Sequence, residues 1–365
     1  MGISILIPMA GSSTFRTSDN VAFPKMLTDI NGKLLLERAA SQFTKIPTEK
    51  DIVVVLPKKQ MEEYNLDKVL TLIDPSITTC AISEGTQGAV CSALLAIESI
   101  DPEKPLIISS FDQVLDVDLY PYLQKFESEN ADAGVLTFKA LHPKWSFVKL
   151  DEAGYVTQAE EKRPISDNAI AGFYYFKKAS LFIEAAKNLI RKSVMHDGLF
   201  YVSHSLNEVI LKGGKVLSQM IEQNKYFHFH DEHALDSYEE YVNKYKRNGA
   251  NTLLKQTKAY VEAFNSKSLS DIEELISDNF SLTDPAGTVN GKQSVLEYIK
   301  NIFIEHEQLS FTAKNIIVDS NISLIEFELT LNDEKLVGTD LIKWNNDNKM
   351  IQMDAYLYGL DDGKN

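Results

Sequence analysis

Short apolar runs alternate with helical patterns over the first third of the chain. The β-branched run Ile3–Ile7 ends at Pro8, and apolar runs of similar length occupy 51–56 and 106–110. Such short runs, bounded by Pro or polar turns, predict strands that are buried on both faces. Segments with helical spacing occupy 34–43, 59–73 and 89–97. The alternation predicts a Rossmann-like α/β domain, in which ligands bind where the strands end.

After residue 131 the pattern favours antiparallel strands. Strands are predicted at 133–138, 147–150, 155–159 and 169–176, followed by a helix over 180–191. A late strand over 226–231 alternates His with aromatic residues, and a helix is expected over 238–246. We therefore expect a mixed, mostly parallel sheet.

The pattern changes near Gly249. Helices are predicted at 253–264, 270–276 and 294–305, and period-2 strands at 312–318, 323–331, 336–344 and 350–358. Helices followed by a curled antiparallel sheet predict a smaller α+β cone. We expect two domains, residues 1–247 and 250–361.

The length, net charge and cysteine content of the chain exclude several classes of function. The length of 365 residues leaves room for two domains of about 100–200 residues each. A formal net charge of −15 argues against nucleic-acid or anionic-membrane binding. No apolar run approaches the about 18 residues of a membrane span. Cys80 and Cys91 form neither a disulfide framework nor a metal-ligand pattern. The reduced cytoplasm is the expected location.

Two small-residue loops follow predicted strands. One contains Gly11 and Thr14, and its backbone N–H groups can face an anion; Lys25, after a Pro, can reach back over it. The other, over 84–89, opens a helix. Asp112 and Asp231 come at the ends of strands, where carboxylates can hold Mg²⁺. A phosphate cradle, a cation and metal-binding carboxylates are the parts that phosphoryl or nucleotidyl transfer requires.

These residues carry a family resemblance. Residues 1 to about 245 resemble the sugar-phosphate nucleotidylyltransferases, whose Rossmann-like fold is also called GT-A. That family opens with Ala-Gly-x-Gly-Thr-Arg and a Pro-Lys, and this chain has Ala-Gly-Ser-Ser-Thr-Phe-Arg at 10–16 and Pro24-Lys25. Its Gly-Thr loop is matched by Gly85-Thr86, and its two metal-binding aspartates by Asp112 and Asp231.

Three further family elements are matched imperfectly. Tyr-Gly-Val corresponds to Trp-Ser-Phe at 145–147, Glu-Lys-Pro to Glu-Lys-Arg-Pro at 161–164, and Asn-Ala-Gly-Ile-Tyr-x-Phe to Ile-Ala-Gly-Phe-Tyr-Tyr-Phe at 170–176. The ordered set is far more specific than any one of its members.

The resemblance implies that a phosphorylated metabolite attacks the α-phosphate of an NTP and releases pyrophosphate, with Mg²⁺ as cofactor. It assigns catalysis to Lys25 and Arg16, metal binding to Asp112 and Asp231, and acceptor binding to Glu161, Lys162 and Gly172. The residues that would bind the nucleotide are Ala10, Gly11, Ser12, Ser13, Thr14, Gly85, Thr86 and Gln87.

The chain also departs from the family pattern. Ser13 replaces a loop glycine, Phe15 stands where the family has its Arg, and Arg16 comes one place late. Ser146 replaces the usual Gly, and Arg163 precedes Pro164. These departures favour an unusual acceptor or a capsule-type subgroup. The resemblance to capsule-type relatives implies CTP or UTP as the donor.

Residues 250 to 360 resemble the nuclear transport factor 2-like superfamily, which includes SnoaL-like cones. The resemblance is carried by residues 280–291 and the helix and long strands that follow. In such a cone Asp340 and Asp354 are expected to point into the pocket, with Tyr356 beside them, where a carboxylate can do acid–base chemistry. Ligand binding and homodimer formation are the alternative roles for this part.

The histidines are weaker candidates. His228 and His230 share one face of the predicted strand at 226–231 but lack the further ligands of a transition-metal site. His196 and Asp197 are candidates for the acceptor pocket.

Three functions follow from these observations. The first is a Mg²⁺-dependent nucleotidylyltransferase that serves capsule or surface polysaccharide synthesis. The second is a glycosyltransferase of the same fold that uses a nucleotide sugar. The third, motivated by Ser13 and Phe15, is a nucleotide-binding scaffold without catalysis.

Overall fold

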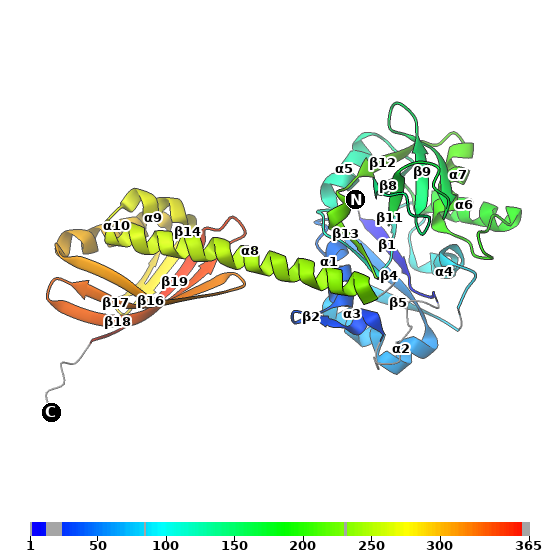
Figure 1. Ribbon diagram of the computed structural model, residues 1–365. Coiled ribbons are helices and arrows are strands. Elements are labelled where there is room, and N and C mark those ends of the chain that lie inside the picture. Colours follow the sequence, from blue (N-terminus) through cyan, green and yellow to red (C-terminus); the bar gives the residue numbers. More distant parts are fainter. Residues whose placement is uncertain (1, 12–23, 84, 230–231, 360–365) are drawn as a thin grey trace. The chain divides into compact units, whose positions relative to one another are not determined.

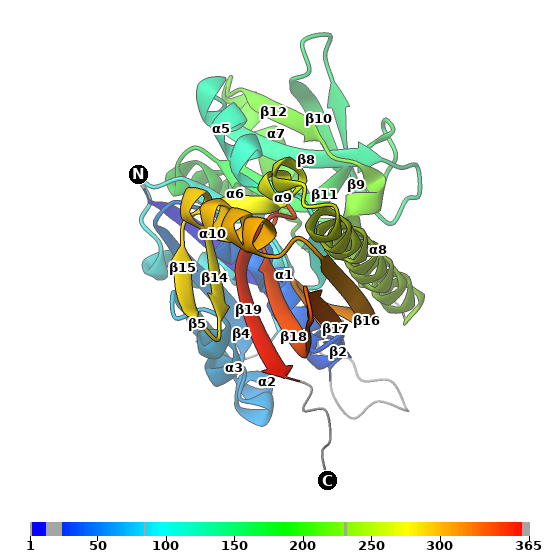
Figure 2. The same cartoon turned by 90° about the vertical axis from the view of Figure 1, so that its left-hand side faces the viewer.

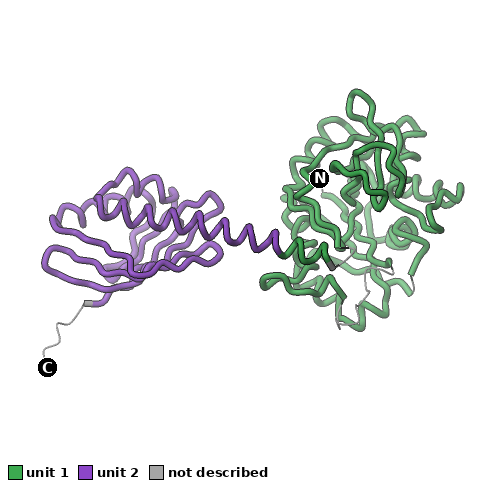
Figure 3. Tube along the Cα trace, in the orientation of Figure 1, with its two compact units in different colours: residues 1–239 green, residues 240–365 purple. Residues whose placement is uncertain are grey.

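A computed structural model of the chain describes residues 2–11, 24–83, 85–229 and 232–359. The chain divides into two compact units, residues 1–239 and 240–365 (Figure 3). One helix, α8 (Glu232–Asn265), contributes residues to both units. Among the described residues, no helix combines the length and the apolar character needed to cross a membrane.

The first unit is built on a nine-stranded mixed sheet. The strands run in the order β10-β9-β11-β6-β1-β4-β5, with β8 paired to β11 and β12 paired to β8. Strands β6, β1, β4 and β5 are mutually parallel, whereas β11 runs antiparallel to β6. The strands of this sheet are β1 (Ile3–Pro8), β4 (Lys50–Pro57), β5 (Ile77–Ile82), β6 (Leu106–Ile108), β8 (Ala133–Lys139), β9 (Ser146–Leu150), β10 (Val156–Glu161), β11 (Asn168–Phe176) and β12 (Val216–Met220).

Helices cover both faces of this sheet (Figure 1). Leu6 and Val53 belong to the buried cluster that packs against α4, α6 and α7, whereas the alternate residues Ile5 and Ile52 are buried on the other face. The helices are α1 (Leu35–Thr44), α2 (Lys58–Tyr64), α3 (Leu66–Ile73), α4 (Ala89–Leu95), α5 (Tyr120–Ser128), α6 (Ala179–Lys192) and α7 (Val202–Leu211).

Short elements complete the first unit. They are the 3-10 helices η1 (Lys25–Leu27), η2 (Ile97–Ser99) and η3 (Gln223–Lys225), the strand pair β2 (Asp29–Ile30) and β3 (Lys33–Leu34), and the strand pair β7 (Gln113–Leu115) and β13 (Tyr226–His228).

The second unit has a six-stranded sheet in the order β15-β14-β19-β18-β17-β16. Helices α8, α9 and α10 lie on one face of it (Figures 1 and 2). Its remaining elements are α9 (Leu269–Leu275), β14 (Ile276–Asp284), β15 (Gly287–Asn290), α10 (Lys292–Glu305), β16 (Leu309–Asp319), β17 (Ile322–Leu331), β18 (Glu334–Trp344) and β19 (Met350–Gly359). A Rossmann-like mixed sheet followed by a smaller α+β unit confirms the predicted fold class.

Two helical predictions were wrong. The segment predicted as one helix over 59–73 is broken at Asn65, which adopts a left-handed conformation with φ of 50°. Conversely, the helices predicted at 238–246 and 253–264 are one continuous helix, α8, with Gly249 inside it. A glycine costs a helix only about 1 kcal/mol, which 34 residues of helix can absorb.

The prediction for the cone carboxylates was half right. Asp340 pairs with Ala355 across β18 and β19, and both line a cavity inside the second unit. Asp354 and Tyr356 are each one residue from Ala355, so they lie on the opposite face of the sheet. The face of each strand depends on its register, and a slip of one residue reverses it.

Candidate active site

The first candidate loop begins where β1 ends. Ala10 is buried and Gly11 exposed just after that strand. Ser12, Ser13, Thr14 and Arg16 lie outside the described residues. Lys25 opens the helix η1, which the buried side chain of Met26 anchors.

The second loop lies against the first. A Cβ atom added to Gly85 would come 3.6 Å from the carbonyl oxygen of Ala10. The Thr86 hydroxyl donates to the carbonyl oxygen of Gly88 at 3.0 Å and hydrogen bonds with Ser92 at 2.6 Å, which fixes the loop to the start of α4. Gly85 and Gln87 are exposed. Gly85 and Ala10, which follow the ends of β5 and β1, therefore lie side by side.

Phe200 holds this second loop in place. Its N–H donates to the carbonyl oxygen of Gln87 at 2.9 Å, and its own carbonyl accepts from the N–H of Val90 at 3.3 Å. Gly88 has a φ of 101°, and a Cβ there would lie 2.5 Å from the carbonyl oxygen of Phe200. A glycine is therefore required at this contact.

Asp112 follows β6, and the pairing of β7 with β13 brings a distant segment to it. Its carbonyl accepts from the N–H of Phe229 at 2.8 Å, and its carboxylate lies 3.7 Å from Nε2 of His228. The Asp112 side chain is 34% exposed, so it can reach a ligand. Asp231 lies outside the described residues. Within the described ranges, no three His, Cys, Asp or Glu side chains gather as metal ligands.

Glu161 is a buried carboxylate held by two hydroxyl groups. It is 5% exposed at the end of β10. Its Oε2 accepts from the hydroxyl of Ser146 at 2.5 Å and from that of Ser203 at 2.8 Å. Burial, and then the charge of Glu161, raise the pKa of the neighbouring Tyr174 phenol. Ser146, where the family pattern has Gly, therefore supplies a partner for the predicted acceptor residue.

Lys162 lies beside Tyr201 and Asp197. Its Nζ is 5.3 Å from the centre of the Tyr201 ring and 3.6 Å from Oδ2 of Asp197. The neighbouring Tyr201 phenol group, and then the charges of Asp197 and Glu161, raise the pKa of the Lys162 ammonium. His196 lies 3.4 Å from Asp197. A permanent cation thus stands next to the buried Glu161.

Gly172 packs against Gln113 at a bulge in β11. Its φ is 59°, and its carbonyl accepts from the Ser109 hydroxyl and from Nε2 of Gln113, both at 2.9 Å. Gln113 also accepts a hydrogen bond from the Tyr226 hydroxyl at 2.9 Å. Because Gln113 follows Asp112 directly, Gly172 fixes the chain beside the predicted metal ligand.

Several residues that contact the predicted ones were not themselves predicted as site residues. Trp145 packs edge-on against His228, with ring centres 5.5 Å apart, and forms a wall next to Asp112. Ser203 and Tyr201 come from α7 and the residue before it, a helix that the apolar pattern did not reveal. The family pattern marked Trp145, but no sequence signal marked Ser203 or Tyr201.

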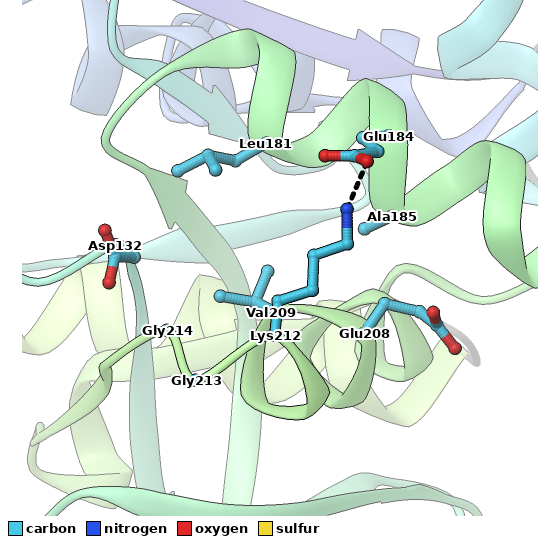
Figure 4. Close-up of a pocket in the computed structure, with 9 residues that line it drawn as sticks. All are labelled: Asp132, Leu181, Glu184, Ala185, Glu208, Val209, Lys212, Gly213 and Gly214. Carbon is cyan, nitrogen blue, oxygen red and sulfur yellow. Dashed lines mark ion pairs between the residues drawn. The ribbon is translucent and has the colours of Figure 1, made fainter.

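A separate surface pocket of about 230 Å³ lies between α6 and α7 (Figure 4). Its charged groups are engaged: Lys212 pairs with Glu184, and Glu208 pairs with Lys192 at 2.8 Å. None of the predicted site residues lines it. The pocket is therefore distinct from the candidate site.

Comparison with known proteins supports both family resemblances found in the sequence. A model of the nucleotidyl transferase family matches residues 21–227, and a model of the SnoaL-like domain matches residues 257–353. No curated protein sequence matches the chain significantly.

Two solved structures are similar. A nucleoside-diphosphate-sugar pyrophosphorylase from Vibrio cholerae RC9 is 19% identical with a TM-score of 0.57, over 66% of this chain and 100% of that one. A candidate glucose-1-phosphate thymidylyltransferase from Bacillus anthracis, solved with sucrose, is 14% identical with a TM-score of 0.52, over 64% of this chain and 92% of that one. At these identities the likeness shows the fold, whereas the family match covers more than half of the chain. The chain belongs to the nucleotidyl transferase family.

Proposed function

We propose that this nucleotidyltransferase joins an NTP, with CTP or UTP preferred, to a phosphorylated metabolite such as a sugar phosphate. A phosphate oxygen of the acceptor attacks the α-phosphorus, the bond from that phosphorus to the bridging oxygen breaks, and pyrophosphate leaves. The product would serve capsule or surface polysaccharide synthesis. We assign this activity to residues 1–247 and a separate SnoaL-like domain to residues 250–361.

The observation that carries the proposal is the buried Glu161 at the end of β10, with Lys162 directly after it in the chain. Oε2 of Glu161 is saturated by two serine hydroxyls. Its other carboxylate oxygen is then the one left to accept hydroxyl groups of an acceptor, and the adjacent Lys162 ammonium can bind the acceptor phosphate. A polyhydroxylated phosphate ester presents hydroxyl groups for the carboxylate and a phosphate group for the ammonium.

The donor side rests on the two adjoining loops. Their backbone N–H groups, with Lys25, would bind and orient the nucleotide phosphates. Asp112 is a partly exposed carboxylate, and carboxylate oxygens are the ligands that Mg²⁺ prefers, so this residue fits a magnesium site. When bound with Asp112 and Asp231, Mg²⁺ would neutralise charge on the phosphates.

The test begins with the nucleotide. The full chain is heated with CTP, UTP, dTTP, GTP or ATP, each with Mg²⁺, and the shift of the unfolding temperature is measured. A nucleotide at about 100 times its Kd adds about 2.7 kcal/mol of stability. Lys25→Ala should reduce this shift.

Pyrophosphate release with a panel of sugar phosphates then tests the acceptor. Glu161→Gln should lower kcat/KM by about 10- to 100-fold, since hydrogen bonds to a charged group contribute about 1.5–3 kcal/mol. It should leave the nucleotide shift intact. Glu160→Gln, a neighbouring carboxylate that is not held by the two serines, is the matched control. Nucleotide binding without pyrophosphate release would favour the scaffold, and transfer from a nucleotide sugar would favour the glycosyltransferase.

A further inference from the structure

The second unit contains a cavity between the concave face of its sheet and helices α8, α9 and α10. Its volume is about 80 Å³, several times the about 10–15 Å³ that one water molecule needs. The space therefore suits a small molecule of about one ring. Most of its lining is aromatic, aliphatic or Met side chains, including Phe264, Phe280, Phe311, Phe327 and Met353.

Four polar side chains also line this cavity, and three of them have partners. The Tyr298 hydroxyl donates to Oδ2 of Asp284 at 2.5 Å, and the Tyr260 hydroxyl contacts Sδ of Met353 at 3.6 Å. The fourth is Asp340, on the inward face of β18 and only 3% exposed. Within the described part of the chain, its carboxyl group has no hydrogen bond or ion pair.

A buried carboxylate without a partner is unfavourable. Burial raises the pKa of Asp340 to about 7, so the group is only partly ionised at neutral pH. No Lys, Arg or His is among the described residues that line the cavity, so this unit offers no cation of its own there. A bound cation would supply the missing partner and restore the ionised form.

The surroundings of Asp340 favour an organic cation over a metal ion. Aromatic rings attract ammonium groups through their faces, and the apolar walls match a hydrocarbon body. A metal ion would need several oxygen ligands, whereas this lining offers one free carboxyl group. The negative charge of the whole chain also attracts cations.

We infer that the cavity of residues 240–365 binds a small organic amine, whose ammonium group pairs with Asp340 while its apolar part fills the space among Phe264, Phe311 and Phe327. This site is separate from the proposed nucleotidyl transfer site, and its test does not depend on that reaction.

Calorimetric titration of the full chain with benzylamine tests the inference, with benzyl alcohol as the uncharged probe of similar shape. Benzylamine should bind with one site per chain, and benzyl alcohol should bind at least tenfold more weakly. Asp340→Asn should lower the affinity for benzylamine by about 10- to 100-fold, which is what the loss of a charged hydrogen-bonded pair costs. Asp354→Asn, on the opposite face of the same sheet, should leave the affinity for benzylamine unchanged.

The pH dependence separates ion pairing from other contacts. The titratable groups that face Asp340 are Tyr260 on α8, Asp284 on β14 and Tyr298 on α10. Burial raises the pKa of both tyrosines, that of Tyr298 to about 12, so neither titrates near neutral pH. Benzylamine affinity should therefore fall about tenfold per pH unit below pH 7, as Asp340 takes up its proton.

Three results would overturn the inference. They are no binding of benzylamine, equal binding of benzyl alcohol, or unchanged binding to Asp340→Asn. Loss of binding in Asp284→Asn alone would place the cation at the other carboxylate and also overturn it. Asp340→Asn removes a buried charge without changing side-chain size, so it should fold, and circular dichroism confirms this before titration.

Discussion

Replacing Gly172 by Ala should destabilise the first unit strongly, and the structure sets the magnitude. The φ of 59° costs an L-residue roughly 1–2 kcal/mol. The new Cβ would lie 2.1 Å from Oε1 of Gln113, a side chain only 1% exposed. Gln113 cannot move away without losing a buried hydrogen bond to Tyr226 or Ser109, which costs about 1–3 kcal/mol. The sum is roughly 2–5 kcal/mol.

Urea unfolding measures this loss in a Trp344→Phe background, in which Trp145 is the sole tryptophan and its fluorescence reports the first unit. The control is Gly154→Ala. Gly154 also has a positive φ, of 87°, but a Cβ there meets nothing within 4 Å. That variant should lose only the roughly 1–2 kcal/mol of the left-handed backbone. Equal losses in Gly172→Ala and Gly154→Ala would refute the collision with Gln113 as the dominant cost.

Two further predictions concern buried carboxylates. Ser203→Ala removes one of the two hydroxyl donors to Glu161 and should lower the stability of the first unit by about 1–2 kcal/mol in the same urea titration, and an unchanged midpoint would contradict this. The second unit should become more stable as pH falls from 8 to 4, because the pKa of Asp340 is about 7 in the folded chain against an ordinary value of 3.8. The penalty for ionising Asp340 is full above about pH 7 and absent below about pH 3.8, and it reaches up to about 4 kcal/mol. Asp340→Asn should lack this pH-dependent component in thermal unfolding, and an identical pH slope in that variant would refute the assignment.

The strand pattern of the first unit was predictable because buried parallel strands leave long apolar runs. The runs at Ile3–Ile7 and 51–56 lie within β1 and β4. Helix ends were less predictable, since Asn65 breaks one amphipathic segment while Gly249 leaves another intact. Asn65 adopts a left-handed conformation and ends a helix, whereas Gly249 costs the long α8 only about 1 kcal/mol and leaves it continuous.

The candidate site was predictable as a set of loops at strand ends, but not as a set of contacts. Glu161 and its partner Ser146 were both marked by the family pattern, the first as a match and the second as a departure. Nothing in the sequence showed that the Ser146 hydroxyl would hydrogen bond to Glu161. Nor did it show that Ser203, 42 residues after Glu161, would donate a second hydrogen bond. Such contacts depend on how β9, β10 and α7 pack together.

Phe200 connects the two halves of the proposed site along the chain. Its N–H donates to the carbonyl oxygen of Gln87 in the 85–88 loop, and its carbonyl accepts from the N–H of Val90 in α4. Tyr201 and Ser203, which follow within three residues, contact Lys162 and Glu161. For substrates bound as proposed, any shift of this short segment on nucleotide binding alters the acceptor side directly. Linkage then requires reciprocity, so the factor by which the nucleotide changes acceptor affinity equals the factor by which the acceptor changes nucleotide affinity.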